Sequence, residues 1–446
     1  MRRYLLTLLF ISTAVAKTIA QEVTPLSLEE CINYAMRHNY LVKNAKLDVQ
    51  IQNAQSNQIQ AGALPRITGK GEIDDNLNAQ QAFLPAEFFG GPKGSFQAVT
   101  FTPHYAGSAY INGTQTLFDG TLLVALRAKK TILELSRMNG EVTKETIRYN
   151  VTRSYYSLAI AYRQFSVIQN TLGYARHLEH DVNITYKSGF AEKIDVERTS
   201  VQVNNLANDS LRVANILATS EQMLKYQMGM DITTPIVLTD TNMAAQETEA
   251  MSLLNEDEDY NRVPEYNLLT IGLRLNEFNV KRYQLAALPT LNTFGNVGYN
   301  YSSNKFKDLL PGGAGYLFSS IVGLQLNVPI FSGFLRTNQL REAKLNVEKN
   351  KNNIAYVKQG LDFQTAAART ILTNNLIQAK SQKSNLEVAK DVLDLAQKKY
   401  KAGVGSNIEI DQAQTALAQA QNNYFNALLD VITAETDLKK ALGLLK

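Results

Sequence analysis

Two acidic residues occupy the same place in two copies of one turn motif. Asp195 lies six residues after Gly189, and Glu409 lies six residues after Gly403. Carboxylates that an assembly holds close together attract cations and titrate with pH. A carboxylate in the first turn of a helix has a simpler use, because it stabilises the positive end of the helix dipole. The pattern leaves both roles open, and the two are compatible.

Other reactive side chains are sparse. Among the four histidines, only His177 and His180 lie close in sequence. With the acidic residues beside them, their spacing could hold a metal on one helical face, but we favour a solvated helix face. Cys31 is the only cysteine, and no acid, base and nucleophile cluster together. The glycine pairs lack the lysine and hydroxyl residue of a phosphate-binding loop. We therefore expect no enzyme, no metal site and no cofactor.

The sequence is internally duplicated. Three short motifs occur in both halves in the same order: Leu64-Pro65 and Leu288-Pro289, Phe118-Asp119-Gly120 and Phe331-Ser332-Gly333, Tyr186-Lys187-Ser188-Gly189 and Tyr400-Lys401-Ala402-Gly403. The second and third pairs are offset by 213 and 214 residues and the first pair by 224. A nearly constant spacing with divergent side chains is typical of a structural repeat. We divide the chain into repeat 1 (residues 21–230), a linker (231–262) and repeat 2 (263–446).

Residues 1–20 have the layout of a secretory signal peptide, with two arginines ahead of an apolar run. Without the three basic residues of this end (Arg2, Arg3 and Lys17), the 45 Lys and Arg become 42 against 41 acids, a balance that argues against a nucleic-acid partner. No later segment approaches the roughly 20 apolar residues of a membrane-spanning helix. We expect any membrane crossing to use strands.

Long proline-free stretches predict long helices. No proline occurs in residues 104–234 or 330–446, whereas a proline inside a helix costs about 3 kcal/mol. The Tyr-Lys-x-Gly turns, near residues 187–194 and 401–408, divide each stretch. We therefore predict two long antiparallel helical hairpins.

Heptad seams run along the returning helices. Large and small residues alternate at steps of three and four: Ile410, Ala413, Leu417, Ala420, Tyr424, Ala427, Val431, Ala434 and Leu438. The same register runs from Val196 to Leu224 in repeat 1. Such seams predict closely packed coiled-coil layers.

Alternating polar and apolar residues precede each long helix and predict strands, at residues 64–76, 106–118, 288–302 and 317–331. A period of two places one face in an apolar medium and the other in water. On the first strand Lys70, Glu72 and Asp74 share one face, which we assign to a water-filled lumen.

The strand count predicts an oligomer. Four strands cannot close a barrel, and open sheet edges are not tolerated in lipid. Two chains would give an eight-stranded barrel, and side chains fill the interior of a barrel of that size. Three chains give twelve strands and room for a lumen. We predict a membrane α+β homotrimer with a 12-stranded β-barrel and long coiled-coil hairpins.

With these features the chain resembles the TolC-type outer-membrane channel family over nearly all of its length after the signal. The matching marks are Leu28, Ala35 and Asn39, together with the duplicated Leu-Pro, Phe-x-Gly and tip motifs. The resemblance implies a homotrimer in the outer membrane of a Gram-negative bacterium. Its 12-stranded β-barrel would continue into a long α-helical coiled-coil barrel in the periplasm. It also implies a belt of mixed secondary structure midway along the periplasmic part, built from the chain ends and the linker.

What the resemblance implies about function is an exit duct. Such ducts serve tripartite pumps that expel drugs, small toxic compounds or metal ions, and they dock a periplasmic adaptor and an inner-membrane transporter of the RND, ABC or MFS type. A duct for type I protein secretion is the alternative. An exported coiled-coil adhesin or scaffold is an alternative of another class, although it does not explain the strands.

The resemblance also implies roles for the tip residues. Asp195 and Glu409 match the periplasmic pore constriction. The family's tip turns, together with its latch and adaptor contacts, correspond in this chain to Tyr186, Gly189, Tyr400, Gly403 and Gly405. Gly405 stands where better-studied members have a latching arginine, which leaves the strength of closure open. For the external loop 77–105, rich in phenylalanine, capping of the barrel mouth is one candidate use.

Overall fold

A computed structural model describes residues 24–239, 246–309 and 316–445. The predicted signal peptide, residues 1–20, lies outside them. The chain forms two compact units. The first draws its described residues from Met1–Val49, Ser136–Thr270 and Asn352–Lys446, and the second consists of Gln50–Leu135 and Ile271–Lys351. Among the described helices, none is long and apolar enough to cross a membrane.

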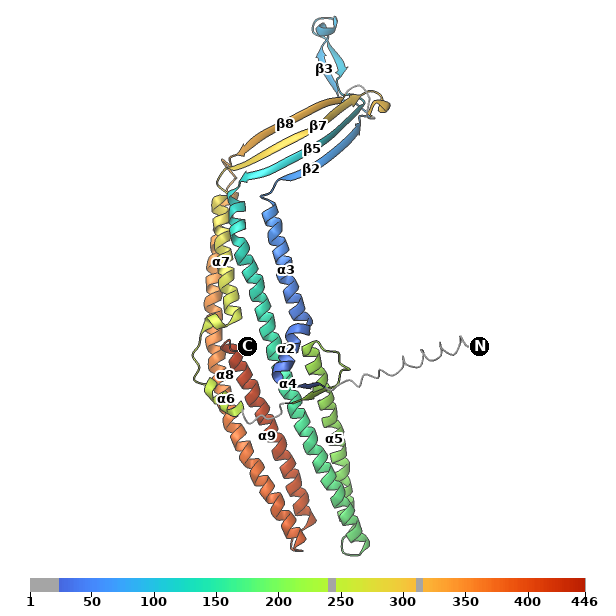
Figure 1. Ribbon diagram of the computed structural model, residues 1–446, viewed down its shortest axis with the longest axis vertical. Helices are drawn as coiled ribbons and strands as arrows, with labels where there is room; N and C mark the ends of the chain where they lie inside the picture. Colours follow the sequence, from blue (N-terminus) through green and yellow to red (C-terminus); the bar gives the residue numbers. More distant parts are fainter. Residues whose placement is uncertain (1–23, 240–245, 310–315, 446) are drawn as a thin grey trace, which may run out of the picture. The chain divides into compact units, whose positions relative to one another are not determined.

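A four-stranded antiparallel sheet dominates the second unit (Figure 1). Its order is β2-β5-β7-β8, so β2 and β8 are the edges. The strands are β2 (Arg66–Asp75), β5 (Tyr105–Phe118), β7 (Thr290–Ser303) and β8 (Tyr316–Asn327).

Prolines explain where these bounds differ from the predicted ones. Strands β2 and β7 begin one residue after Pro65 and Pro289, and β8 ends two residues before Pro329 instead of reaching residue 331. Proline has no N–H to donate to a ladder and restricts the residue before it.

The strand register gives the sheet one polar and one apolar face. Lys70 pairs with Tyr110, Glu72 with Ser108 and Asp74 with Ala106. Continuing across the sheet, this mainly polar face adds Asn112 and Thr114 of β5, Asn292, Asn296 and Asn300 of β7, and Ser319, Gln325 and Asn327 of β8, with Phe294, Leu317 and Ile321 as its large apolar members. The opposite face carries Ile67, Ile73, Ile111, Leu291, Val297, Tyr299, Phe318, Val322, Leu324 and Leu326. Val322 is 85% exposed and Ile67 is 73% exposed.

The predicted loop 77–105 contains a second, two-stranded sheet. Strand β3 (Gln81–Pro85) pairs with β4 (Phe96–Thr100), and a short 3-10 helix, η1 (Ala86–Phe89), follows β3. We predicted a loop here, and the structure instead pairs two strands within it. The glycine pair Gly90-Gly91 ends η1, and Gly90 adopts the left-handed conformation (φ 78°) that closes the tip.

Two helices of 68 and 67 residues, α4 (Gly120–Lys187) and α8 (Leu335–Lys401), follow the strand pairs. The helices α3 (Tyr40–Ala61) and α7 (Pro264–Leu285) precede the pairs. At the start of α4, the Asp119 carboxylate accepts hydrogen bonds from the Thr121 amide and hydroxyl at 2.7 and 2.8 Å. This cap explains why a long helix begins at the Phe-x-Gly motif.

The returning helices, α5 (Lys193–Met228) and α9 (Asn407–Ala441), bury their seams. In α9 the buried seam residues are Ile410, Ala413, Ala420, Ala427, Val431, Ala434 and Leu438. In α5 they are Thr199, Leu206, Ser210 and Leu224. The small residues in both seams permit the close helix packing that the heptads predict.

Short elements complete both units. The main core of the first unit packs α2 (Leu28–His38) with α4, α5 and α9 around Cys31 and Tyr155. The parallel pair of β1 (Thr24–Leu26) and β6 (Ile236–Leu238) borders it. A second core packs α6 (Gln246–Leu253) on α8 and α9, and η3 (Tyr260–Arg262) precedes α7. In the second unit, η4 (Phe306–Leu309) lies against β5 and β7.

Each returning helix ends in a glycine that packs directly on backbone. Gly229 (φ 70°) and Gly443 (φ 68°) are both left-handed. A Cβ at Gly229 would lie 2.8 Å from the Asn39 Cα, and one at Gly443 would lie 2.6 Å from the Arg262 carbonyl carbon. These contacts join the end of each hairpin to the residues just before the helix that opens the strand pair of the same repeat. That helix is α3 in repeat 1 and α7 in repeat 2.

Gly229→Ala and Gly443→Ala should each lower the free energy of unfolding by about 2–4 kcal/mol, through left-handed strain and steric overlap. Gly173→Ala, inside α4 with open space around its Cα, should raise it by about 0.5–1 kcal/mol. Denaturation of the detergent-solubilised variants measures all three. Equal stability of the three would contradict the packing role.

Candidate functional site

The two hairpin tips have the same backbone structure. Gly189 (φ 80°) and Gly403 (φ 75°) are left-handed. The Gly189 amide donates to the Tyr186 carbonyl at 2.9 Å, and the Gly403 amide donates to the Tyr400 carbonyl at 3.0 Å. The amide of the following residue donates to the carbonyl one position earlier in the helix. Phe190 donates to Thr185 at 3.0 Å, and Val404 donates to Lys399 at 3.1 Å. This is the Schellman pattern, and it requires glycine at the turn.

The structure also explains why position 405 is a glycine. A Cβ at this position would lie 2.9 Å from the Tyr400 amide nitrogen and 3.0 Å from the Lys399 Cβ. The second tip therefore turns back on its own helix too closely for a larger side chain. The latch and adaptor roles predicted for Tyr186, Tyr400 and these glycines stay predictions.

Both tips expose one apolar side chain that the sequence analysis missed. Phe190 is 86% exposed and Val404 is 79% exposed, each directly after the left-handed glycine. The signal was present, because in a Schellman turn this position usually holds an apolar residue that packs on the preceding helix. Here both side chains point into solvent, which leaves them available to a partner.

The two predicted constriction acids lie in the first turn of the returning helices. Asp195 is on α5, and the Arg198 guanidinium lies 3.9 Å from its carboxylate. Glu409 is on α9, where its amide donates to the Ser406 hydroxyl at 3.3 Å and its carboxylate lies 3.8 Å from Lys399 Nζ. Such long, exposed ion pairs are weak. Within one chain the arrangement serves helix capping, and a shared carboxylate ring stays a prediction.

A small pocket between the two hairpins lies just beyond these acids. Tyr174 of α4 and Asp411 of α9 line one small pocket with Gln202 of α5. Burial raises the pKa of the Asp411 carboxyl, and burial is also the main reason that the pKa of Tyr174 is raised. The Gln202 amide donates to the Thr415 hydroxyl at 3.4 Å. The sequence analysis missed Asp411, which stands two residues after Glu409.

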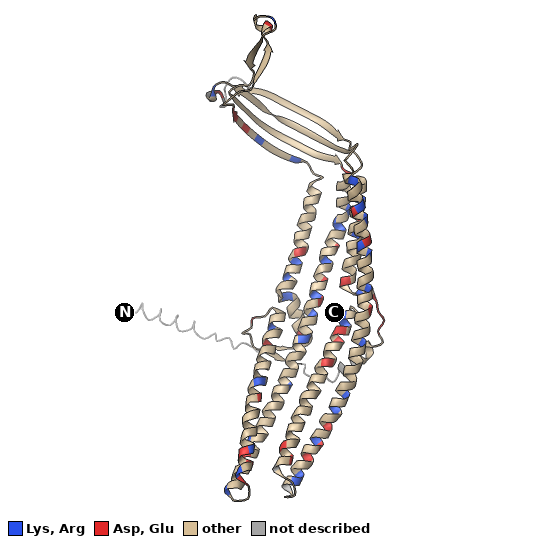
Figure 2. Cartoon of the chain, turned by 180° about the vertical axis from the view of Figure 1, so that it is seen from behind, with Lys and Arg blue, Asp and Glu red and all other residues tan. Residues whose placement is uncertain are grey.

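The charged residues of the four-stranded sheet all lie on β2, as Figure 2 shows. Lys70 Nζ lies 2.6 Å from the Glu72 carboxylate, and both side chains are about half exposed. Asp74 shares their face. Their assignment to a lumen stays a prediction, and the polar character of the whole face supports it.

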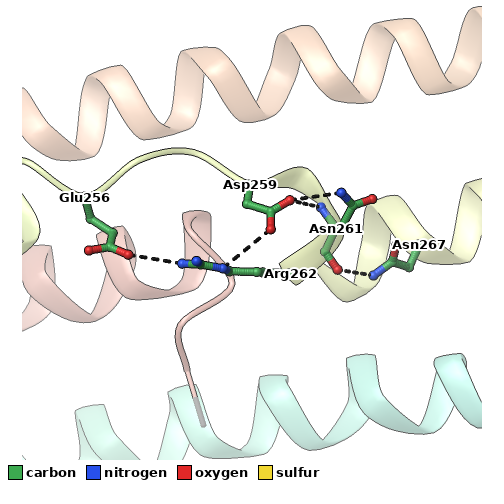
Figure 3. A network of polar contacts seen from close by, with 5 residues as sticks. All are labelled: Glu256, Asp259, Asn261, Arg262 and Asn267. Carbon is green, nitrogen blue, oxygen red and sulfur yellow. Dashed lines mark hydrogen bonds and ion pairs between the residues drawn. The ribbon is translucent and has the colours of Figure 1, made fainter.

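The acidic run of the linker, residues 256–259, forms ion pairs within the chain (Figure 3). The Arg262 guanidinium lies 3.1 Å from Glu256 and 3.6 Å from Asp259. Arg369 of α8 lies 3.4 Å from Glu258 and donates to the Glu256 carbonyl at 2.5 Å. These bonds fix the linker on α8 and hold the Arg262 backbone where Gly443 packs.

One buried acid of the first unit has no ion-pair partner among the residues that the structure describes. Glu145 of α4 is 4% exposed. Burial raises the pKa of its carboxyl to about 7, and the field of Lys440 only partly opposes that rise. The folded protein therefore favours the protonated form below about pH 7.

Reactive clusters are not a feature of the described structure. In the part of the chain that the structure covers, no three His, Cys, Asp or Glu side chains are grouped so that they could hold a metal ion. Cys31 is fully buried, and burial raises its pKa to about 12. The conspicuous features are instead a two-faced sheet, long hairpins and paired tips.

This combination matches one family of membrane proteins. The family model described as "Outer membrane efflux protein" matches residues 31–261 and 273–444. The chain belongs to this family. It is 23% identical to the outer membrane protein TolC of Vibrio cholerae over 355 residues, which cover 76% of this chain and 77% of that protein. It is also 23% identical to the probable efflux pump outer membrane protein TtgC of Pseudomonas putida over 427 residues, covering 94% and 83%.

Solved structures show the same fold. The Campylobacter jejuni CmeC outer membrane channel matches with a TM-score of 0.71 and 16% identity, over 93% of this chain and 85% of that one. The open state of the Neisseria gonorrhoeae MtrE channel matches with a TM-score of 0.69 and 17% identity, over 94% and 89%. The predicted TolC-type fold is confirmed. This outer membrane efflux protein is a Gram-negative outer-membrane protein that extends into the periplasm, and its family is one of channels.

Glu145→Gln should raise the free energy of unfolding by about 2–3 kcal/mol at pH 8 and by much less at pH 5. The stability that protonated Glu145 provides is complete below its unfolded pKa of 4.5 and is lost as the pH rises through the folded value of about 7. Glu141→Gln, one turn earlier and half exposed, is the control and should have little effect. Urea unfolding at both pH values measures the change, and an equal gain at both would contradict the assignment.

Proposed function

We propose that this outer membrane efflux protein is the exit duct of a tripartite efflux pump. The observation that carries the proposal is the sheet with one polar and one apolar face and two open edges, β2 and β8. A duct needs this arrangement, because the apolar face contacts lipid while the polar face lines water. The long hairpins supply the periplasmic part.

The open edges support a trimer. In lipid every backbone amide and carbonyl needs a partner, so β2 of one copy must pair with β8 of the next. Three copies then give twelve strands and a lumen wide enough for water. The three β2 strands bring Lys70, Glu72 and Asp74 of each copy into that lumen.

Small organic compounds are the proposed cargo. Relatives with similar coverage are described as toluene and antibiotic efflux pump proteins of Pseudomonas putida. A duct for type I protein secretion would share the architecture, and the described efflux relatives favour the pump. The transporter behind the duct, of the RND, ABC or MFS type, would select the cargo.

The tips are the proposed docking site for the periplasmic adaptor. Phe190 and Val404 are exposed apolar side chains at the ends of the two hairpins. An adaptor with an apolar contact would bury them, and the neighbouring Tyr186 and Tyr400 would border that contact.

Purified protein in detergent should have the mass of three chains and should form channels in planar bilayers. The barrel argument requires both, since four strands cannot close alone. Mass measurement by light scattering and single-channel recording are the tests. A stable monomer or dimer, or a trimer without conductance, would exclude the duct.

Asp195→Asn combined with Glu409→Gln should weaken cation selectivity and block by divalent cations. Up to six carboxylates would meet at the tip of a trimer, and both changes are nearly isosteric. Asp119→Asn, at the other end of α4, is the control and should leave tip block unchanged. Single-channel recording with divalent ions on the periplasmic side decides: unchanged selectivity and block in the double variant would assign both acids to helix capping.

A further inference from the structure

The β3–β4 hairpin has an uncovered apolar face. Its register pairs Phe83 with Ala98 and Pro85 with Phe96, so these four side chains share one face. Phe83 is 71% exposed and Phe96 is 69% exposed. Exposed phenylalanines of this size favour a partner that removes them from water.

The hairpin is an ordered element. At its tip the Ala86 amide donates to the Ser95 carbonyl at 2.9 Å, and the Gly94 amide donates to the Glu87 carboxylate at 3.1 Å. Glu87 and Lys93 are its only charged residues, and both lie at the tip. The apolar face therefore carries no charge that would keep copies of it apart. A two-stranded hairpin is marginally stable alone, so this one gains from being covered.

The position of the hairpin indicates what covers its apolar face. It continues from the ends of β2 and β5, where the Asn76 amide donates to the His104 carbonyl at 2.7 Å and the Asn76 side chain donates to the Pro103 carbonyl at 2.9 Å. Strand β2 is an edge of the sheet, the edge at which the next copy must pair. The hairpin thus grows from the subunit boundary itself.

We propose that the faces formed by Phe83, Pro85, Phe96 and Ala98 pack against the same faces of the other two copies and form an apolar collar at the outer mouth. This inference rests on the proposed trimeric duct. Association within the trimer is intramolecular, so even a small apolar face suffices. An apolar constriction opposes the passage of water and ions by dewetting, so the collar restricts leakage through an idle duct.

Two alanines on opposite faces provide a matched test. Ala98 lies on the collar face, and Ala82 pairs with Val99 on the other; both are exposed. Cys31 does not interfere, because it is fully buried. Treated with a short bis-maleimide, the Ala98→Cys trimer should give roughly tenfold more crosslinked dimer than the Ala82→Cys trimer, because the collar raises the effective concentration of the first position.

Conductance supplies a second readout. Phe83→Ser combined with Phe96→Ser should raise the single-channel conductance severalfold while the mass stays that of a trimer, because the barrel is independent of the hairpin. Trimers with equal crosslinking at both positions, or with unchanged conductance in the double variant, would overturn the collar alone. A probe at position 98 quenched by spin-labelled lipid would overturn it in favour of a membrane surface. A monomer would instead overturn the proposed duct, and the collar with it.

Discussion

The need to satisfy the backbone at a sheet edge governs this molecule. Within one chain β2 and β8 stop with unpaired edges, although their apolar face must contact lipid in an outer-membrane protein. Lipid offers no hydrogen bonds, so the edges can be satisfied only by further copies of the chain. The concentration of charge on β2 is consistent with this constraint, because Lys70, Glu72 and Asp74 share the mainly polar face of the sheet.

The helical part solves a different problem, which is to hold very long hairpins in register. Both repeats use the same devices at matching positions. Besides the glycines at positions 229 and 443, each returning helix carries a partly buried ion pair in its last turns, Glu221 with Lys225 at 2.6 Å and Glu435 with Lys439 at 2.7 Å. Lys225 also donates to the Ile232 carbonyl at 3.0 Å, which binds the chain leaving α5. Duplication thus preserved the joints more strictly than the surfaces between them.

At the tips, a residue with a folding role also lies where the proposed constriction would form. Glu409 stabilises the start of α9 through its position after the Ser406 cap, and the same position places its carboxylate at the end of the hairpin. The basic neighbours Arg198 and Lys399 moderate the negative charge of each tip. Further from the tips, the Gln202 amide donates to the Thr415 hydroxyl and so links repeat 1 to repeat 2.

The amino-acid sequence alone determined the duplication, the long helices, the seams, the tip turns and the strands, because each follows from local periodicity or from proline and glycine at a specific place. The heptads from Ile410 to Leu438 and the alternation in β8 are such local signals. Tertiary structure decided the rest. Whether Arg369 pairs with Glu258, or whether Tyr174 and Asp411 line one pocket, depends on segments far apart in sequence. The β3–β4 hairpin also escaped prediction, because its short strands carry apolar residues on both faces, and only cross-strand pairing reveals which phenylalanines lie together.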